Sequence, residues 1–443
     1  MKSKILEMTG GERAFAMAVM PVRGPKGFRK LDYEFAADPR RLNVKEIVEK
    51  CYDHGFNAIG VVIKDTDGAC LWDTQVGWNP TGRDVLGEFV DAAGDHGDLK
   101  VIASITTIHD AYQGHVHPKR VARSWRGVPD THDEGEMRVD VPPGRTWEQV
   151  KQKVPFLTRK LDAKVGASRE ARGRGYFPLT SFMCPNSRHL EYLEDLTFEV
   201  VRKYPSMVAI LADYIRYNHA KNCYCPRCRA EFRRRYGKPV PRLAPVRSDW
   251  LDFREDNVAA WAARFHATVK RANPNCYTGA FILPEMLYNL VCRGFLGQSW
   301  WKLGAILDFL SPMVYPYLMG TIDDGAFWRL LADVTFRLQN RIMRQRSKML
   351  PAEILCITNS VECNAEEMLI QMKAYDYGKG IGLFKYFGTS EGQWRVLKKY
   401  ISKVKAHPHP DRGLVVPFKR PPDWDVTKIA EPHVKAMERR HPD

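Results

Sequence analysis

The chain has 443 residues, and its 68 Lys and Arg against 52 Asp and Glu give a formal net charge of +16. With 44% hydrophobic and 27% charged residues it has the composition of a globular protein, which excludes disorder over most of its length. Its longest apolar runs, such as residues 14–20 and 207–212, are far shorter than the roughly 18 residues of a membrane-spanning helix, so no membrane span is expected.

Short apolar runs along the chain predict eight strands. Most of these runs are almost continuously apolar, which is typical of strands buried on both faces of a parallel sheet. In chain order the predicted strands cover residues 15–21, 58–63, 100–105, 207–213, 277–283, 307–315, 349–357 and 380–387.

Amphipathic stretches between these runs predict helices. They cover residues 43–54, 82–96, 187–203, 246–272, 324–345, 363–377 and 390–405. Asn364 with Glu367, and Ser390 with Gln393, have the spacing of a capping box at a helix start. The alternation of strands and helices predicts an α/β fold of the (β/α)8 TIM barrel type, with an open doubly wound sheet as the alternative. No glycine-rich phosphate loop follows the first strand, which argues against dinucleotide binding.

The connection between the third and fourth strands is much longer than the others. Residues 106–186 form an insertion rich in His, Arg, Gly and Pro, and we expect it to shape the active site. The barrel is predicted to cover residues 1–405, and the Pro-rich residues 406–443 are predicted to form an irregular strap over the barrel or a loose tail.

Charged residues at the ends of predicted strands are candidates for chemistry, because the active site of such a barrel lies at the carboxyl ends of its strands. Asp213 and Glu285 closely follow the fourth and fifth strands, and Glu353 lies within the seventh. Two neighbouring carboxylates provide the nucleophile or base and the proton donor of glycoside hydrolysis. Asp213 is expected to have a low pKa, supplied by Arg216 or Lys385, and Glu285 a pKa raised by apolar neighbours. The alternative is an ion pair of Asp213 with Arg216 or Lys385 that closes the barrel mouth.

Other residues at the strand ends are candidates for substrate binding. Aromatic rings there could stack on sugars, and cationic groups could bind carboxylate or sulfate groups of an anionic carbohydrate. These candidates are Arg23, Lys64, Trp72, His109, Arg216, Tyr217, Tyr315, Lys385 and Tyr386.

A cluster of cysteines follows the fourth strand. Cys223, Cys225 and Cys228 have the C-x-C-x2-C spacing of a zinc knuckle, and the stretch after them has the pattern of a helix whose amino end favours thiolates. Tetrahedral zinc needs a fourth ligand, for which Cys184 is the first candidate and His219 the second. The alternative is three reduced thiols near a surface. Ten Cys in a chain without an apolar amino-terminal signal predict reduced thiols and a cytoplasmic location.

Residues 184–237 resemble the catalytic barrels of the broad glycosyl-hydrolase-like group, and residues 223–228 are similar to the zinc-binding cysteine cluster of family 42 β-galactosidases. Further similarity lies around Pro118 and over residues 311–317. The resemblance implies a (β/α)8 barrel that acts on carbohydrate. It also implies a structural zinc bound by Cys184 together with the other three cysteines, which occur in matching order.

The resemblance carries over to the catalytic candidates only in part. Asp213 resembles the nucleophile position of amylase-type barrels, and Glu285 resembles their acid/base. Family 42 enzymes have an Asn-Glu pair where this chain has Ala212 and Asp213, so their mechanism does not transfer, and Glu353 is only a weak match to their nucleophile.

The sequence therefore predicts a glycosidase that cleaves a glycosidic bond, with a structural zinc. A catalytically degenerate carbohydrate-binding barrel is the alternative. Nucleic acid binding driven by the positive charge is the least favoured, because the basic runs 229–237 and 341–348 are not part of a known nucleic-acid-binding motif. The sequence leaves open whether the chain forms a homo-oligomer.

Overall fold

The computed structural model describes part of the chain. The described residues are 3–11, 13–21, 37–127, 129–132, 139–140, 176–177, 180–218, 220, 222–241, 248–283, 294–315, 352–361, 363–376 and 379–406. Within them no helix is long and apolar enough to cross a membrane.

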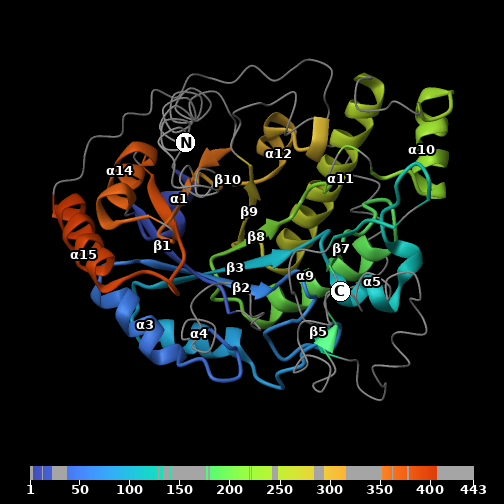
Figure 1. Cartoon of the computed structure of the whole chain (residues 1–443). Helices are drawn as coiled ribbons and strands as arrows, with labels where there is room; N and C mark the ends of the chain where they lie inside the picture. The colour runs from blue at the N-terminus through green and yellow to red at the C-terminus, as the bar shows by residue number, and fades with distance from the viewer. Residues whose placement is uncertain are drawn as a thin grey trace.

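Parallel strands form the centre of the molecule (Figure 1). In chain order they are β1 (Ala14–Val19), β2 (Ala58–Lys64), β3 (Lys100–Thr106), β8 (Ala209–Asp213), β9 (Tyr277–Ile282), β10 (Phe309–Pro312), β11 (Glu353–Ile354), β12 (Ile357–Asn359) and β13 (Gly380–Phe384). Their order in the sheet is β11-β10-β9-β8-β3-β2-β1-β13-β12. Each predicted apolar run overlaps one of these strands, and the seventh run overlaps two.

The sheet closes through its seventh strand, which is divided into β11 and β12. β11 pairs with β10 on one side, and β12 pairs with β13 on the other. Between the two pieces, the Leu355 N–H donates to the Leu310 carbonyl at 3.0 Å and the Gly382 N–H donates to the Cys356 carbonyl at 2.8 Å. Since β11 and β12 stand at the two ends of the sheet order, the described strands form a closed ring. The predicted (β/α)8 barrel is confirmed, and the open sheet is excluded.

Helices surround this ring. They are α3 (Val44–Asp53), α4 (Val85–Gly94), α9 (His189–Lys203), α11 (Ser248–Ala272), α12 (Trp300–Ile306), α14 (Ala365–Tyr375) and α15 (Glu391–Ala406). In Figure 1, α14 and α15 lie on one side of the strands and α9 and α11 on the opposite side. The capping boxes at Asn364 and Ser390 are confirmed. The predicted helix over 324–345 lies outside the described residues, and α12 was not predicted.

A short helix that was not predicted, α1 (Lys4–Met8), covers the amino-terminal end of the barrel. Its Ile5 and Met8 pack against the residues that fill the barrel interior, among them Ala16, Ala58, Ala209, Leu211 and Phe309. The Lys4 ammonium lies 2.6 Å from the carboxylate of Asp308, just before β10. This end of the barrel is therefore sealed by apolar packing and an ion pair.

The long connection between β3 and α9 contains α5 (Ala111–Val116), the single turn η1 (Pro118–Arg120) and four two-residue strands. The pairs are β4 (Thr131–His132) with β7 (Thr180–Ser181), and β5 (Val139–Asp140) with β6 (Tyr176–Phe177). The predicted insertion is thus confirmed at this position in the chain. The predicted strap, residues 406–443, lies outside the described residues except for its first residue, which ends α15.

Gly279 in β9 makes room for the ring of Phe309, which fills the barrel interior. A Cβ at residue 279 would lie 2.7 Å from carbons of that ring. We expect Gly279→Ala to lower the free energy of unfolding by about 1–3 kcal/mol, because overpacking forces the ring or the strand to move. Urea unfolding monitored by circular dichroism measures the change.

The control for this prediction is Gly94→Ala near the end of α4, where a Cβ would meet nothing within 4 Å. Alanine is the better helix former, so this variant should be as stable as the native protein or slightly more stable. Equal stability of Gly279→Ala and the native protein would contradict the packing described.

Candidate active site and cysteine cluster

Asp213 is the last residue of β8 and lies at the carboxyl end of the barrel. It alternates along the strand with Ala209 and Leu211, which fill the barrel interior, so its side chain belongs to the inward-facing set. Thr107 holds its carbonyl, through its N–H at 2.9 Å and its Oγ1 at 2.8 Å. The Tyr214 N–H donates to Asp213 Oδ1 at 2.7 Å. Both the backbone and the carboxylate of Asp213 are therefore fixed.

A second carboxylate, Asp65, belongs to the same electrostatic group, although it was not among the predicted site residues. It directly follows β2, whose register with β3 shifts between Val62 and Lys64. Such a bulge changes the direction in which the next side chains point. The charges of Asp65 and Asp213 are close enough to influence each other, and Asp65 is also close to Lys385. The signal that identified Asp213, a carboxylate at the carboxyl end of an apolar strand, also applies to Asp65, which comes two residues after the predicted run 58–63.

Burial controls the protonation of these groups. It raises the pKa of Asp213 to about 6, with the Tyr214 N–H and Arg216 opposing the rise and the charge of Asp65 adding to it. The expected low pKa of Asp213 is thus wrong, because desolvation outweighs Arg216.

Asp65 and Lys385 are shifted in the directions that favour their neutral forms. Burial raises the pKa of Asp65, against hydrogen bonds from Thr66 and the charges of Lys385 and Lys64. Burial likewise lowers the pKa of Lys385 to about 8, and the charge of Asp65 opposes this. Asp65 therefore has two cations near it where Asp213 has one.

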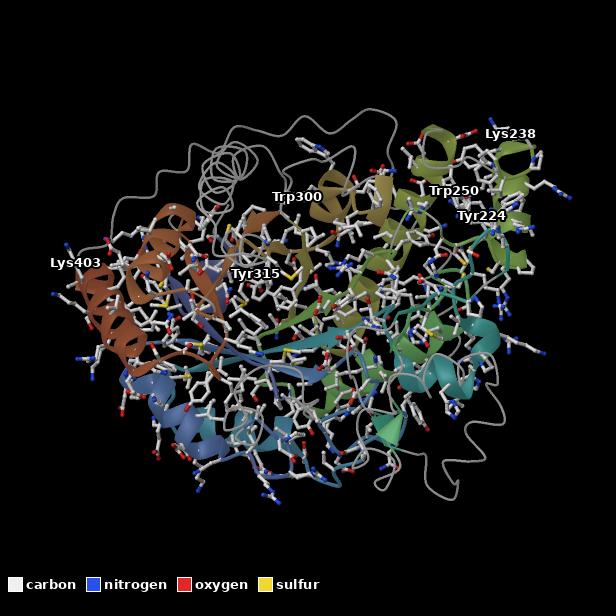
Figure 2. The ribbon with its side chains drawn as sticks, viewed as in Figure 1. Tyr224, Lys238, Trp250, Trp300, Tyr315 and Lys403 are labelled. Atoms are coloured by element: carbon white, nitrogen blue, oxygen red, sulfur yellow. The ribbon has the colours of Figure 1, made fainter. Side chains whose placement is uncertain are left out.

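Three of the predicted substrate-binding residues lie around Asp213. Tyr315 follows β10 and is labelled in Figure 2. Its ring is tilted against that of Phe384 with 5.7 Å between centroids, and burial and the charge of Asp213 raise its pKa. The Arg216 guanidinium lies 4.4 Å from the ring centroid of Tyr214. His109 is buried, and its ring meets the Tyr214 ring edge-on at 4.9 Å.

Lys64 is also at this end of the barrel, but its charge is already paired inside the protein. Its Nζ lies 2.9 Å from Asp110 Oδ2, and neither side chain has any exposed surface. Nζ also donates to the Thr106 carbonyl at 2.9 Å. Lys64 therefore supports the structure beneath the candidate site.

Three predicted aromatic residues pack elsewhere. Trp72 is fully buried, and its Nε1 donates to Glu199 at 3.0 Å. The Tyr217 hydroxyl accepts a hydrogen bond from Asn257 at 3.0 Å and is also buried. The Tyr386 ring packs edge-on against Trp394 of α15, with 5.5 Å between centroids. These three rings thus contact residues of α9, α11 and α15 respectively.

Glu353 lies at the opposite end of the barrel. It is the first residue of β11, and its carboxylate accepts hydrogen bonds from Ser3 Oγ and the Ile5 N–H, both at 2.8 Å. It binds α1 to the barrel floor, so we leave it out of the candidate active site. Arg23 and Glu285 lie outside the described residues.

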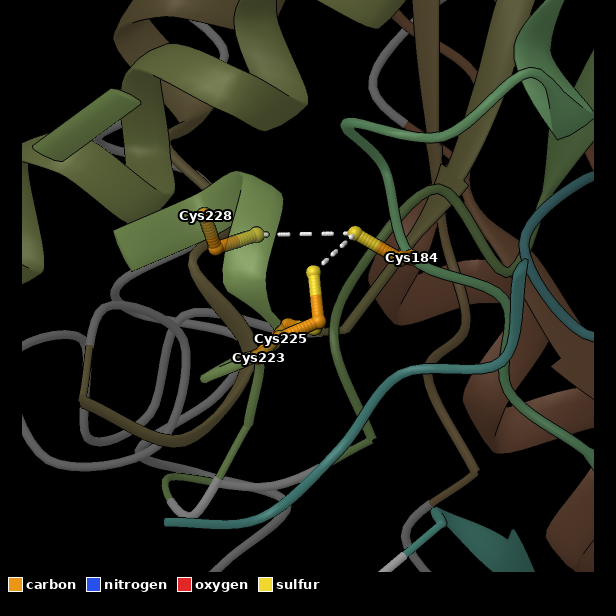
Figure 3. A group of neighbouring side chains, drawn as sticks. All are labelled: Cys184, Cys223, Cys225 and Cys228. Atoms are coloured by element: carbon orange, nitrogen blue, oxygen red, sulfur yellow. Dashed lines mark hydrogen bonds between the residues drawn. The ribbon is translucent and has the colours of Figure 1, made fainter. Parts of the chain in front are cut away.

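The four predicted cysteine ligands form a buried cluster. Cys184 precedes α9, and Cys223, Cys225 and Cys228 lie in the loop after β8 and at the start of α10 (Pro226–Tyr236). Their sulfur atoms all lie within 4.8 Å of one another, and Cys184 Sγ is 3.5 Å from the sulfurs of both Cys225 and Cys228 (Figure 3). Four thiols at these distances could hold one metal ion.

Donors around the sulfurs complete this cluster. The Arg123 N–H donates to Cys223 Sγ at 3.4 Å, the Asn186 N–H to Cys184 Sγ at 3.4 Å, and Asn186 Nδ2 to Cys228 Sγ at 3.3 Å. Hydrogen bonds to sulfur favour the thiolate form and orient metal ligands. The donor set therefore suits a thiophilic metal such as zinc.

Comparison with known proteins supports the fold alone. No family model and no curated protein matches the chain. Among solved structures, it is similar to the glycoside hydrolase domain of PgaB (BpsB) from Bordetella bronchiseptica, with 11% identity and a TM-score of 0.59, over 89% of this chain and 98% of that one.

Two further structures show the same likeness. A β-galactosidase from Marinomonas ef1 has 12% identity and a TM-score of 0.59, over 88% of this chain and 59% of its own. An α-L-fucosidase isoenzyme from Paenibacillus thiaminolyticus has 15% identity and a TM-score of 0.55, over 89% of this chain and 50% of its own. This chain thus spans between half and three fifths of the length of these two. The distant similarity to glycoside hydrolase barrels, inferred from the sequence, is confirmed at the level of the fold.

The raised pKa of Asp213 has a consequence for stability. Its pKa is about 6 in the folded protein, against an ordinary aspartate value of 3.8, so ionisation of Asp213 destabilises the folded state. Asp213→Asn should therefore raise the free energy of unfolding at pH 7 by about 1–3 kcal/mol, the lower end allowing for partial exposure of the side chain. Urea unfolding at several pH values measures this difference.

The pH dependence gives the control. Below about pH 4 Asp213 is protonated in both the folded and the unfolded protein, so the native protein and Asp213→Asn should be nearly equally stable there. As the pH rises above about 4, the native protein should lose stability relative to the Asn variant, because Asp213 ionises more readily in the unfolded chain. An Asn variant that is less stable at pH 7 would instead support the ion pair of Asp213 with Arg216.

Proposed function

We propose that the protein is a glycoside hydrolase that uses Asp213 as the proton donor and Asp65 as the ionised nucleophile or base. The observation that carries this proposal is the electrostatic coupling of two carboxylates at the carboxyl end of a glycosidase-like barrel. Glycoside hydrolysis needs one carboxyl group that is protonated and one that is ionised, on opposite sides of the scissile bond.

The surroundings of the two groups support this division of roles. The pKa of about 6 for Asp213 suits a group that holds a proton in mildly acidic conditions and gives it to the leaving oxygen. Burial raises the pKa of Asp65 as well, but the ammonium groups of Lys385 and Lys64 oppose that rise, so Asp65 has more support for its ionised form than Asp213 has. Glu285 remains the alternative to Asp65 as the second carboxylate, because in the sequence it comes shortly after Ile282, the last residue of β9.

We further propose that the substrate is a carbohydrate with anionic groups. Arg216 and Lys385 place two cationic side chains next to the carboxylates, and the Tyr315 ring offers a surface for stacking on a sugar. Release of phenol from a panel of aryl glycosides, neutral sugars beside uronides, tests this directly. Faster turnover of uronides is expected. Sugar binding without turnover of any glycoside would favour the degenerate barrel.

The role of Asp213 predicts a dependence on the leaving group. A dinitrophenolate can leave without being protonated, whereas a phenolate needs a proton. Asp213→Asn should therefore lower kcat/KM, which reports the leaving-group step, by about 10²–10⁴ on a phenyl glycoside and far less on the dinitrophenyl glycoside of the same sugar. Asp65→Asn should lower turnover of both substrates, because both need the nucleophile or base. Initial rates with the two glycosides measure the effect.

Asp98→Asn is the control for these variants, since Asp98 is an exposed aspartate after α4, at the other end of the barrel. It should have native rates on both glycosides. An equal loss of kcat/KM on the two glycosides in Asp213→Asn would contradict its role as acid. Native turnover in Asp65→Asn would transfer the second role to Glu285, to be tested in Glu285→Gln.

We also propose that the cysteine cluster holds one zinc ion with a structural role. Cys184, Cys223, Cys225 and Cys228 would fill a tetrahedral site and leave no open position, so the ion would stabilise the loops without taking part in the reaction. Mass spectrometric metal analysis of protein purified without added metal should give about one zinc per chain.

Cys228→Ser should lose the metal and have a lower melting temperature. A metal ion that binds the folded protein but not the unfolded chain stabilises the folded state. Cys363→Ser is the matched control, since Cys363 is half-buried and lies outside the cluster. It should keep the metal. Native protein without zinc, or zinc retained equally in both variants, would contradict this assignment.

A further inference from the structure

Tyr214, the residue after Asp213, has an unusual backbone conformation. Its φ of 49° makes it the one residue other than glycine with a positive φ in the described part of the chain. A side chain with a Cβ disfavours this left-handed region, because the Cβ approaches the following carbonyl. Such conformations persist where the surroundings hold them, and they are concentrated at functional sites.

The hydrogen bond that accompanies this conformation is made to the candidate acid. The Tyr214 N–H donates to Asp213 Oδ1 at 2.7 Å, so the backbone of one residue orients the carboxylate of the residue before it. A hydrogen bond donated to a carboxylate also favours its ionised form. The orientation of the peptide between Asp213 and Tyr214 therefore bears on both the direction and the protonation of the Asp213 carboxylate.

The Tyr214 ring is held on more than one side. The Arg216 guanidinium lies 4.4 Å from its centroid, and the Arg216 N–H donates to the Tyr214 carbonyl at 2.8 Å. His109 meets the ring edge-on at 4.9 Å and itself stacks on Phe182 at 4.2 Å. Cation–π and edge-to-face contacts of this kind stabilise a ring in one position. They can therefore offset the cost of the left-handed backbone.

We propose that Tyr214 is a positioning residue. Its ring is clamped by His109 and Arg216, and this anchor, together with the left-handed φ through which the chain continues, fixes the peptide between Asp213 and Tyr214 so that its N–H stays on the carboxylate of Asp213. This inference rests on the proposed role of Asp213 as the acid. The phenol hydroxyl has no part in it. What matters is the ring as a fixed anchor and the backbone conformation that the anchor maintains.

The proposal predicts an order of activities among substitutions. Tyr214→Phe keeps the ring and should retain kcat on a phenyl glycoside within about twofold. Glycine adopts a positive φ without steric cost, alanine less readily and valine least of all, so kcat should fall from Tyr214→Gly to Tyr214→Ala to Tyr214→Val. The loss in Tyr214→Ala should be about tenfold in kcat with little change in KM, since the substrate still binds.

The pH profile separates positioning from a purely structural role. Without the N–H bond the pKa of Asp213 rises, so the limb on which activity falls at high pH should move up by about 0.5–1 pH unit in Tyr214→Ala. Tyr52→Ala is the control, because Tyr52 is 43% exposed on α3 and stacks on His96, far along the chain from the site. It should leave the profile unchanged.

A measurement without substrate keeps this inference separate from the proposed function. The difference in unfolding free energy between a protein and its Asp213→Asn partner, followed over pH, reports the pKa of Asp213 in each background. That pKa should be higher in Tyr214→Ala than in the native protein, whether or not a glycoside is cleaved. Equal losses of kcat in the Gly, Ala and Val variants, or an unchanged pKa of Asp213, would overturn the proposal.

Discussion

Lys64 and Asp110 form an ion pair on which the carboxyl end of the barrel depends. Their charged atoms lie 2.9 Å apart with no exposed side-chain surface, and Asp110 also accepts the Gln113 N–H at 2.8 Å, which caps α5. Loss of one partner of such a pair leaves a buried charge and costs about 3–5 kcal/mol. Because Lys64 ends β2 and Asp110 begins α5, this pair joins the barrel wall to the long insertion. Because Lys64 is held in place by this pair, the backbone of the next residue, Asp65, is also fixed in position.

Along β8 the barrel interior changes from apolar to charged. On β8 the inward residues are Ala209 and Leu211, and the next inward residue is Asp213. The packing that stabilises the lower part of the barrel therefore also removes water from the carboxylate above it, and this raises the pKa of Asp213. The same burial therefore stabilises the core and destabilises the ionised form of Asp213. Such a cost to stability is expected at a functional site.

The sequence predicted the barrel because strands buried on both faces are continuously apolar, and it found the cysteine cluster because ligand spacing is local. It was less successful where contacts join distant segments. Lys64 looked available for substrate, since its partner Asp110 is not near it in sequence. Glu353 was placed within its strand, but the strand begins there, which puts the side chain at the barrel floor. The pKa of Asp213 was given the wrong direction because depth of burial cannot be read from charge pattern.

The pairing of β1 with β13 has a consequence for the order in which the protein is made. Ala14 lies beside Gly380, and Ile5 is bonded to a residue 348 positions later in the chain. At about 5–20 residues per second, synthesis leaves one edge of β1 without its partner for tens of seconds. An unpaired strand edge is a template for wrong association. Ring closure must wait for translation of the last strand, so the nascent chain needs protection of that edge until then.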